Sequence, residues 1–339
     1  FRLSGSVSTP VITKGLPDPS VPSGIDGIRQ YLDSTGKEQT MKIKITVLLT
    51  VFIMLTSVLC SCGSASGGEE GSAGSTAEQA ATEAPGFAGY AVADSEYINK
   101  RTVSSYCCTN EALIPEGTAV TGFVLEFPGL DGNSCLGGSM DNMIVYNNSF
   151  TKECAGRGIV VAYMFPGPWS WMNKGAVRIT DLVVDALADK YGLSEGEFSL
   201  VVMGGSMGGY GALMFSVGTR HKVTACLAHC PCCDPLNSFA VHPAFPRTYI
   251  CAVNEYDMSF EDALKYSAPV NRIADMPKIP YFITADEHDE CFFVPEITAL
   301  TEKMRDAGLD VTYLFLPGQP HGGYTQEERE KFDRFVFEN

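Results

Sequence analysis

The sequence has little positive charge. Its 24 lysines and arginines stand against 40 aspartates and glutamates, which leaves a formal net charge of −16 and a pI near 4.7. Nucleic-acid binding relies on clustered lysine and arginine, and no basic run of that kind occurs, so we expect no nucleic-acid partner. A length of 339 residues with 45% hydrophobic content indicates a globular chain, long enough for one large domain with a substantial core.

The apolar stretch near the start of the chain is too short for a typical membrane span. It covers residues 45–59, and a transmembrane helix needs roughly 20 residues. Lys42 and Lys44 precede it, and small residues with cysteine follow it, which is the order of an export signal. A transmembrane helix is the alternative. We expect translation to begin at Met41 and residues 1–40 to be an untranslated or disordered upstream segment.

The end of the predicted signal, residues 41–62, points to a lipid anchor. The letters LCSC at 59–62 resemble the lipobox of bacterial lipoproteins, which implies lipidation of Cys62 after cleavage. An ordinary signal with incidental cysteines is the alternative. Residues 63–86 are mainly Gly, Ser, Ala and Glu, so they are expected to form a flexible linker. The chain is thus predicted to be extracellular or a cell-surface lipoprotein, attached to a membrane through its lipid.

Cysteine is plentiful, but its spacing does not indicate structural zinc. The 12 cysteines include the cluster CLAHCPCC at 226–233, which lacks the paired C-x-x-C arms of such sites. Cys226 is expected to pack in a strand as a small hydrophobe, and a disulfide is possible among the later cysteines of an exported domain. We expect no metal and no cofactor.

Residues 87–339 alternate short apolar runs with longer amphipathic ones. This pattern predicts an α/β domain with a mainly parallel central sheet and helices on both faces. Helices are predicted from residue 177 to Gly192, from 294 to Gly308 and over 325–337. Strands are predicted at 120–127, 158–165, 198–204, 223–229, 280–285 and 311–316.

The tetrapeptide GGSM occurs twice, at 137–140 and 204–207. Around Ser139, Asp141 stands where a second glycine would be needed, and no strand runs directly into the segment. Ser139 is therefore predicted to lie in a loop.

The second copy lies in the setting of a catalytic nucleophile. Ser206 follows a predicted strand and precedes a segment that can form a helix. Gly204 and Gly208 complete the spacing G-x-S-x-G, which lets a serine occupy a strained elbow with its hydroxyl exposed. The phosphate-binding patterns G-x-G-x-x-G and G-x-x-x-x-G-K-[ST] do not fit residues 203–211, so those loops are excluded.

A nucleophilic serine needs an imidazole to take its proton and a carboxylate to orient that imidazole. Of the five histidines, His321 is the candidate, because it follows the last predicted strand and is flanked by glycines. The acid should follow the strand at 280–285. That position offers Asp286, Glu287, Asp289 and Glu290.

These motifs, in the order serine, acid, histidine, resemble the α/β-hydrolase superfamily, and in particular its esterase branches, whose elbow reads much like GGSMGGYGAL. The resemblance covers roughly residues 100–339 and implies an α/β-hydrolase fold. A G-x-x-D turn in the relatives puts the acid at Asp289. Asp286 stands at the glycine position of that pattern and remains the alternative. The resemblance also implies that the insertion 230–275 forms a cap.

The resemblance further implies an oxyanion hole made of two backbone N–H groups. One is expected from Met207 and the other from Leu130, in the loop PGLDG. The family often carries a His-Gly motif in that loop, where this chain has Pro128 and Gly129.

The reaction implied is acyl transfer, with Ser206 attacking an ester carbonyl and His321 moving the proton to the leaving alcohol. Trp169 and Trp171 follow a predicted strand at the sheet edge where ligands bind in such folds, so they either stack on the substrate or pack a loop.

A carboxylesterase acting on a small-molecule or polysaccharide ester is the function predicted first. A serine peptidase like the prolyl oligopeptidases is one alternative, although those proteins usually carry a propeller that the segment before residue 100 is too short to build. A non-catalytic surface binding lipoprotein is the other.

Overall fold

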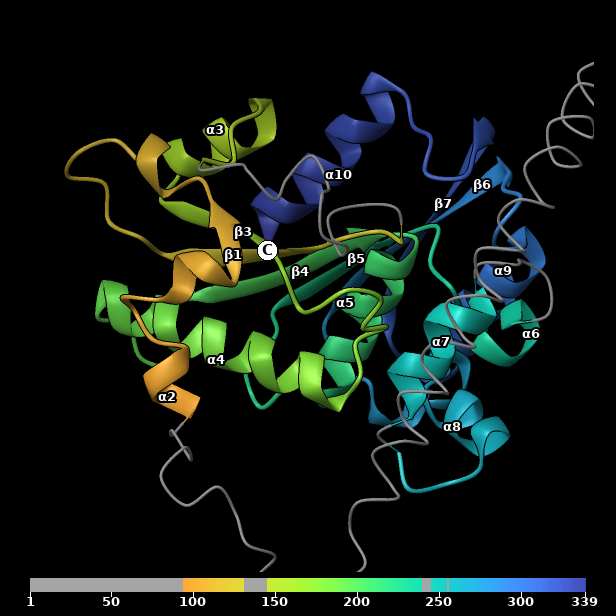
Figure 1. Cartoon of the computed structure of the whole chain (residues 1–339). Coiled ribbons are helices and arrows are strands. Elements are labelled where there is room, and N and C mark those ends of the chain that lie inside the picture. Colours follow the sequence, from red (N-terminus) through yellow and green to blue (C-terminus); the bar gives the residue numbers. More distant parts are fainter. Residues whose placement is uncertain (1–93, 131–144, 240–244, 255) are drawn as a thin grey trace, which may run out of the picture. The chain divides into compact units, whose positions relative to one another are not determined.

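A seven-stranded sheet organises the domain (Figure 1). The computed structural model describes residues 94–130, 145–239, 245–254 and 256–339, all within one structural unit, Ala84–Asn339. The strand order is β1-β3-β2-β4-β5-β6-β7, and only the β1–β3 pair is antiparallel. The strands are β1 (Cys107–Thr109), β2 (Gly122–Phe127), β3 (Ile159–Met164), β4 (Ser199–Gly205), β5 (Ala225–His229), β6 (Pro280–His288) and β7 (Asp310–Pro320).

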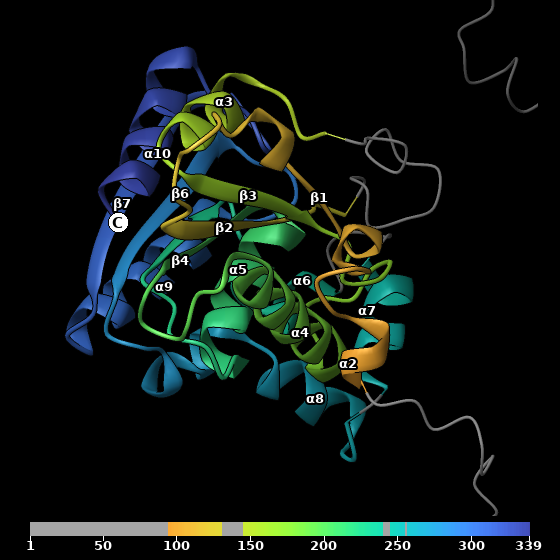
Figure 2. The same cartoon turned by 90° about the vertical axis from the view of Figure 1, so that its left-hand side faces the viewer.

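Helices pack on both faces of the sheet (Figure 2). On one face lie α3 (Ser149–Gly156) and α10 (Gln326–Glu338). On the other lie α4 (Lys174–Tyr191), α5 (Met207–Gly218) and α9 (Val294–Asp306). The shorter helices are α2 (Asp94–Tyr97), α6 (Pro235–Phe239), α7 (Phe245–Val253), α8 (Phe260–Tyr266), and the 3-10 turns η1 (Val103–Ser105), η2 (Glu111–Leu113), η3 (Pro269–Asn271) and η4 (Ile273–Asp275).

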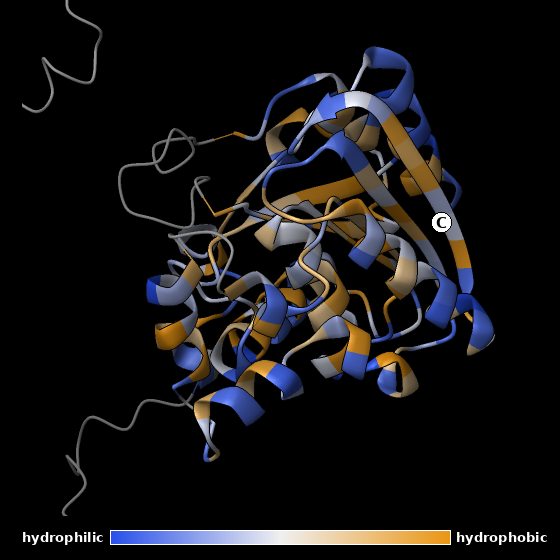
Figure 3. Ribbon diagram, turned by 90° about the vertical axis from the view of Figure 1, so that its right-hand side faces the viewer, coloured by the Kyte–Doolittle hydropathy of each residue, from blue (hydrophilic) through white to orange (hydrophobic). Residues whose placement is uncertain are grey.

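The central strands are buried on both faces, which explains their continuous apolar runs. Successive residues of β3, from Val160 to Ala162, have no exposed surface. Figure 3 shows the hydrophobic strand segments inside the domain and hydrophilic residues on the outer helices. Two apolar cores result, one on each side of the sheet.

The predicted α/β class and the six predicted strands are confirmed, with differences at their ends. The strand β1 was not predicted, because a three-residue edge strand shows no periodicity. The strands β6 and β7 run on to His288 and Pro320, beyond their predicted ends. The helix α4 ends at a left-handed Gly192 with φ 68°, as its glycine predicts.

Several predictions fall on residues outside the described ranges. These are the signal, the linker, Cys62 and the loop serine Ser139. The insertion 230–275 contains α6, α7 and α8, and its role as a cap stays a prediction. None of the helices in the described part of the chain combines the length and the apolar character that a membrane crossing needs.

Candidate active site

Ser206 lies in a tight turn between β4 and α5. Its backbone has φ 59° and ψ −123°, a positive-φ conformation that residues with a side chain rarely adopt. The turn is packed so closely that glycine is needed beside the serine. A Cβ on Gly208 would lie 2.1 Å from the carbonyl oxygen of Phe127, and one on Gly204 would lie 2.5 Å from the carbonyl carbon of Gly208. The strand, turn and helix therefore hold Ser206 at the carboxyl end of the sheet.

The pairing of β6 with β7 brings the acid and the histidine together. His288 of β6 is paired with Pro320 of β7, and a register shift separates this pair from the regular ladder before it. Asp289 follows the last residue of β6, and His321 follows the last residue of β7. They consequently leave the sheet side by side, although 31 residues separate them in the chain.

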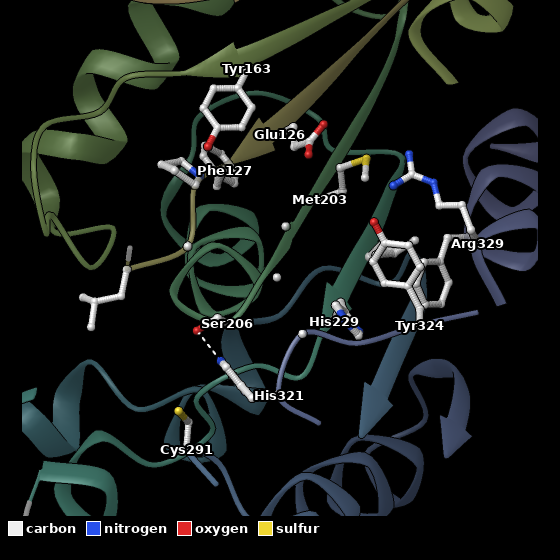
Figure 4. Close-up of a pocket in the computed structure, with 18 of the residues that line it drawn as sticks. Glu126, Phe127, Tyr163, Met203, Ser206, His229, Cys291, His321, Tyr324 and Arg329 are labelled. Atoms are coloured by element: carbon white, nitrogen blue, oxygen red, sulfur yellow. Dashed lines mark hydrogen bonds between the residues drawn. The ribbon is translucent and has the colours of Figure 1, made fainter. Parts of the chain in front are cut away.

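The His321 ring lies between Ser206 and Asp289. Its Nε2 is 2.9 Å from Ser206 Oγ (Figure 4), and its Nδ1 is 2.9 Å from Asp289 Oδ2. The Asp289 side chain is fully buried. Its Oδ1 accepts hydrogen bonds from the backbone N–H groups of Cys291 and Phe292, at 2.7 and 2.8 Å. These bonds hold the carboxylate in position to orient the imidazole.

The surroundings of His321 shift its acidity. Burial alone lowers the pKa of the ring, but the hydrogen bond and the charge of Asp289 outweigh burial, so the pKa of His321 is raised. A neutral ring with its proton on Nδ1 presents Nε2 as an acceptor for the serine hydroxyl.

Asp286 is hydrogen-bonded to the histidine loop rather than to the imidazole. Its side chain is fully buried, and Oδ2 accepts from the backbone N–H of Gly322 at 2.7 Å. Burial raises the pKa of Asp286 to about 6, against the effect of that hydrogen bond. The structure therefore places Asp289 beside the ring of His321. Asp286 instead contacts the backbone of Gly322, the residue after His321.

Of the two residues predicted to form the oxyanion hole, Met207 directly follows Ser206 and Leu130 lies in a loop that passes near it. Met207 is the first residue of α5, where backbone N–H groups have no carbonyl partner within the helix. A Cβ on Gly129 would lie 3.9 Å from Ser206 Cβ, so the loop that carries Leu130 passes close to the serine. Leu130 also lines the same cavity as Ser206.

A cavity of about 420 Å³ opens beside Ser206 and His321 (Figure 4). It lies at the carboxyl ends of β2 to β5, under α10. Its described walls include apolar and aromatic side chains, namely Phe127, Tyr163, Met203, Leu227, Phe245, Tyr324 and Phe332. Its polar side chains other than the serine and the histidine of the site include Glu126, His229 and Arg329.

Comparison with known proteins identifies the fold. Residues 170–338 match the prolyl oligopeptidase family. Similar solved structures include the dipeptidyl peptidase 4 of Porphyromonas gingivalis, with a TM-score of 0.51 and 14% identity, over 67% of this chain and 32% of that chain. The domain has the α/β-hydrolase fold. The matched part of the chain is thus similar to serine hydrolases of the prolyl oligopeptidase type.

Two further structures share this fold. An acylaminoacyl peptidase of Pyrococcus horikoshii has a TM-score of 0.52 and 14% identity, over 66% of this chain and 38% of that chain. A puromycin hydrolase has a TM-score of 0.52 and 18% identity, over 65% of this chain and 33% of that chain. This chain thus spans about a third of the length of these proteins. A search of the curated proteins found no match.

The two tryptophans of this α/β hydrolase are not among the described residues that line the cavity. Trp171 is buried, and its indole N–H donates to Thr248 Oγ1 at 3.1 Å. Its ring stacks on Tyr249, with centroids 3.9 Å apart. Trp169 is partly buried against the same core. Both tryptophans therefore pack the loop after β3, and Trp171 packs it against α7.

The cysteine cluster is buried as free thiols. Cys226 lies within β5, as expected, and burial raises its pKa to about 12. Among the described residues, Cys230 is grouped with Asp286, Asp289 and His321, all of them with potential ligand atoms within 4.8 Å of one another. Two members of that group already hydrogen-bond to each other in the site described above.

Sequence reasoning missed three polar residues that line the cavity. Glu126 could have been recognised from the sequence, because it is the one charged residue in the strand β2. His229 stood out only as a histidine at a strand end; burial lowers its pKa to about 4, so its ring is neutral at physiological pH. Arg329 could not have been recognised from the sequence, since it is one of many charged residues on an amphipathic helix.

Proposed function

We propose that this protein is a carboxylesterase that works by acyl transfer through Ser206. One observation carries the proposal: the two nitrogens of His321 bridge the serine hydroxyl and the buried Asp289 carboxylate, each at 2.9 Å. A serine hydroxyl becomes an effective nucleophile when a base at hydrogen-bond distance takes its proton during attack.

The proposed reaction has two halves. Ser206 Oγ attacks the ester carbonyl while Nε2 of His321 accepts the hydroxyl proton, and Asp289 stabilises the imidazolium that forms. The backbone N–H groups of Met207 and Leu130 would stabilise the negative charge on the carbonyl oxygen. The imidazolium then protonates the leaving alcohol. Water attacks the acyl-serine by the same route and releases the acid.

An ester is the less demanding substrate for this site, because an alcohol leaves the tetrahedral intermediate more readily than an amine does. The cavity of about 420 Å³ is of a size that suits a small-molecule ester or one acyl group of a polysaccharide. Cleavage of peptide bonds is the second candidate, and the match of residues 170–338 to the prolyl oligopeptidase family favours it.

The test compares the full chain with its Ser206→Ala variant. The substrates are short-chain nitrophenyl esters, acetylated and feruloylated sugars, and proline-linked peptide amides. We expect ester turnover in the wild type and a loss of about 10³-fold or more in kcat in the variant, because the nucleophile is gone. Ser139→Ala changes the serine of the other GGSM copy and is expected to retain activity.

The outcomes separate the candidates. Turnover of peptide amides alone would replace the esterase by the peptidase. A folded wild-type chain that cleaves no substrate and does not react with a fluorophosphonate probe would contradict both, and would favour a surface binding protein without catalysis. We also propose that the protein is exported and held at a cell surface through lipid on Cys62, on the basis of its signal-like segment.

A further inference from the structure

Glu126 is a carboxylate in an otherwise largely apolar floor of the cavity. The registers of β3, β2, β4 and β5 place four cavity-lining residues in one row across the sheet: Tyr163, Glu126, Met203 and Leu227. Val124, two residues earlier on the same face, is buried in the apolar core under α3 and α10. Since an apolar side chain would satisfy the packing at this position, the carboxylate needs another explanation.

The Glu126 carboxylate is only partly compensated. The hydroxyl of Tyr146 donates to Oε2 at 2.8 Å, which is the one hydrogen bond that the described residues give this group. Burial raises the pKa of Glu126, and the bond from Tyr146 offsets that effect only in part. Because a carboxylate has about four acceptor sites, Glu126 retains capacity for further donors.

Arg329, the nearby cation, is already engaged by other groups. Its Nε donates to Asp333 at 2.7 Å. Its guanidinium carbon lies 5.0 Å from the ring centroid of Phe150 and 5.9 Å from that of Tyr324. The charge of Arg329 lowers the pKa of Glu126 while that of Asp333 raises it, so the two residues offset each other in part at this carboxylate.

Aromatic side chains complete this end of the cavity. Tyr163 and Tyr324 line it together with Glu126, which lies across the cavity from His321 (Figure 4). Aromatic ring faces attract cations, and a carboxylate attracts them most strongly where water is largely excluded. A cation with several N–H donors would satisfy both features.

We propose that the Glu126 end of the cavity is a subsite for an ammonium group of the substrate, so that the preferred substrate carries an amine on its acyl or alcohol part. This inference rests on the proposed function, because the subsite belongs to the cavity of Ser206. It makes Glu126 a specificity-determining residue of the reaction.

The experiment uses the full chain and matched pairs of esters. One pair is the methyl ester of an ω-aminoalkanoic acid and that of the alkanoic acid of equal length; the other is an aminoalkyl acetate and the alkyl acetate of equal length. We expect kcat/KM for at least one amine to exceed that of its neutral partner by about tenfold or more. Glu126→Gln keeps the shape of the side chain and is expected to abolish this preference, mainly by raising KM for the amine-bearing ester.

Glu296→Gln is the matched control. Burial also raises the pKa of Glu296, but this residue lies on α9 and is not among the described residues of the cavity wall. The control variant is expected to keep the wild-type preference. Circular dichroism establishes that both variants fold.

Binding without turnover provides an independent measurement. Calorimetry is expected to detect n-butylammonium, but not n-butanol, binding to the wild-type chain and to Ser206→Ala. Binding of the amine by a chain that hydrolyses nothing would support the subsite while contradicting the proposed function. Equal rates within both ester pairs together with no amine binding would overturn the inference.

Discussion

Individual residues of the site are positioned by backbone groups as much as by side chains. Asp289 is held by two backbone N–H groups from the turn that follows it. The loop of His321 is tied through the N–H of Gly322 to the buried Asp286. Ser206 is held by a strained turn in which Gly204 and Gly208 leave no room for a Cβ. The precise arrangement of the three side chains thus depends on short-range contacts around each of them.

The pH dependence of hydrolysis follows from His321. Although burial lowers the pKa of the ring, Asp289 raises it further, so the protonated and inactive form persists above the ordinary value of about 6.5. The rate is expected to fall as the pH decreases through this raised pKa. Asp289→Asn should lower kcat by about 10³–10⁴-fold and move the acid limb of the profile to lower pH. The measurement is kcat/KM across the pH range in which the protein stays folded.

Asp286→Asn is the control for that prediction. It leaves the bond between Asp289 and the imidazole intact and is expected to keep kcat within about tenfold of the wild type. If Asp286→Asn proved the more damaging of the two substitutions, Asp286 would be the true partner of His321.

The helix α5 and the strand β2 approach each other closely at the elbow. This approach puts the first turn of α5, with the backbone N–H of Met207, beside the loop that carries Leu130. Glycine at 204 and 208 is what permits it.

Gly208→Ala tests this close approach. Alanine usually stabilises a helix relative to glycine by about 1 kcal/mol. Here the sign should reverse, because the new Cβ would lie 2.1 Å from the carbonyl oxygen of Phe127. We expect a loss of about 2–4 kcal/mol in the free energy of unfolding, measured by denaturant titration. Gly156→Ala, at the end of α3, has no atom within 4 Å of its added Cβ. A similar loss of stability in both variants would show that the contact with Phe127 is not the cause of the loss in Gly208→Ala.

The sequence combines a domain of the α/β-hydrolase fold with a segment that resembles a lipoprotein signal. A lipid on Cys62, followed by a linker that the composition of residues 63–86 predicts to be flexible, would keep the domain near a membrane while leaving its cavity accessible. The predicted substrate would then be an ester outside the cell.

Lipidation is tested by expressing the full chain in a bacterium and labelling it with a fatty acid. The wild type is expected to incorporate the label and to fractionate with membranes, because each CH₂ group of the attached acyl chains that is buried in the bilayer adds about 0.8 kcal/mol to membrane binding. Cys62→Ser is expected to lose both properties, whereas Cys60→Ser should retain them. Label in Cys62→Ser, or none in the wild type, would contradict the predicted anchor.

Much of this protein was determined by local sequence patterns. The apolar runs predicted six strands, and the glycine spacing around Ser206 predicted a turn that only small neighbours permit. These features follow from sequence because a strand, a helix or a tight turn depends on residues close together in the chain. The order of serine, acid and histidine was likewise readable, because chain order needs no coordinates.

Only the tertiary structure decided which of these residues meet. The pairing of His288 with Pro320 places Asp289, rather than Asp286, beside His321, and no sequence pattern specifies that register shift. The packing of α10 over the carboxyl ends of the strands joins Arg329 to the cavity of Glu126. These contacts join residues far apart in the chain, so they depend on how whole elements pack, whereas local patterns specify only the elements themselves.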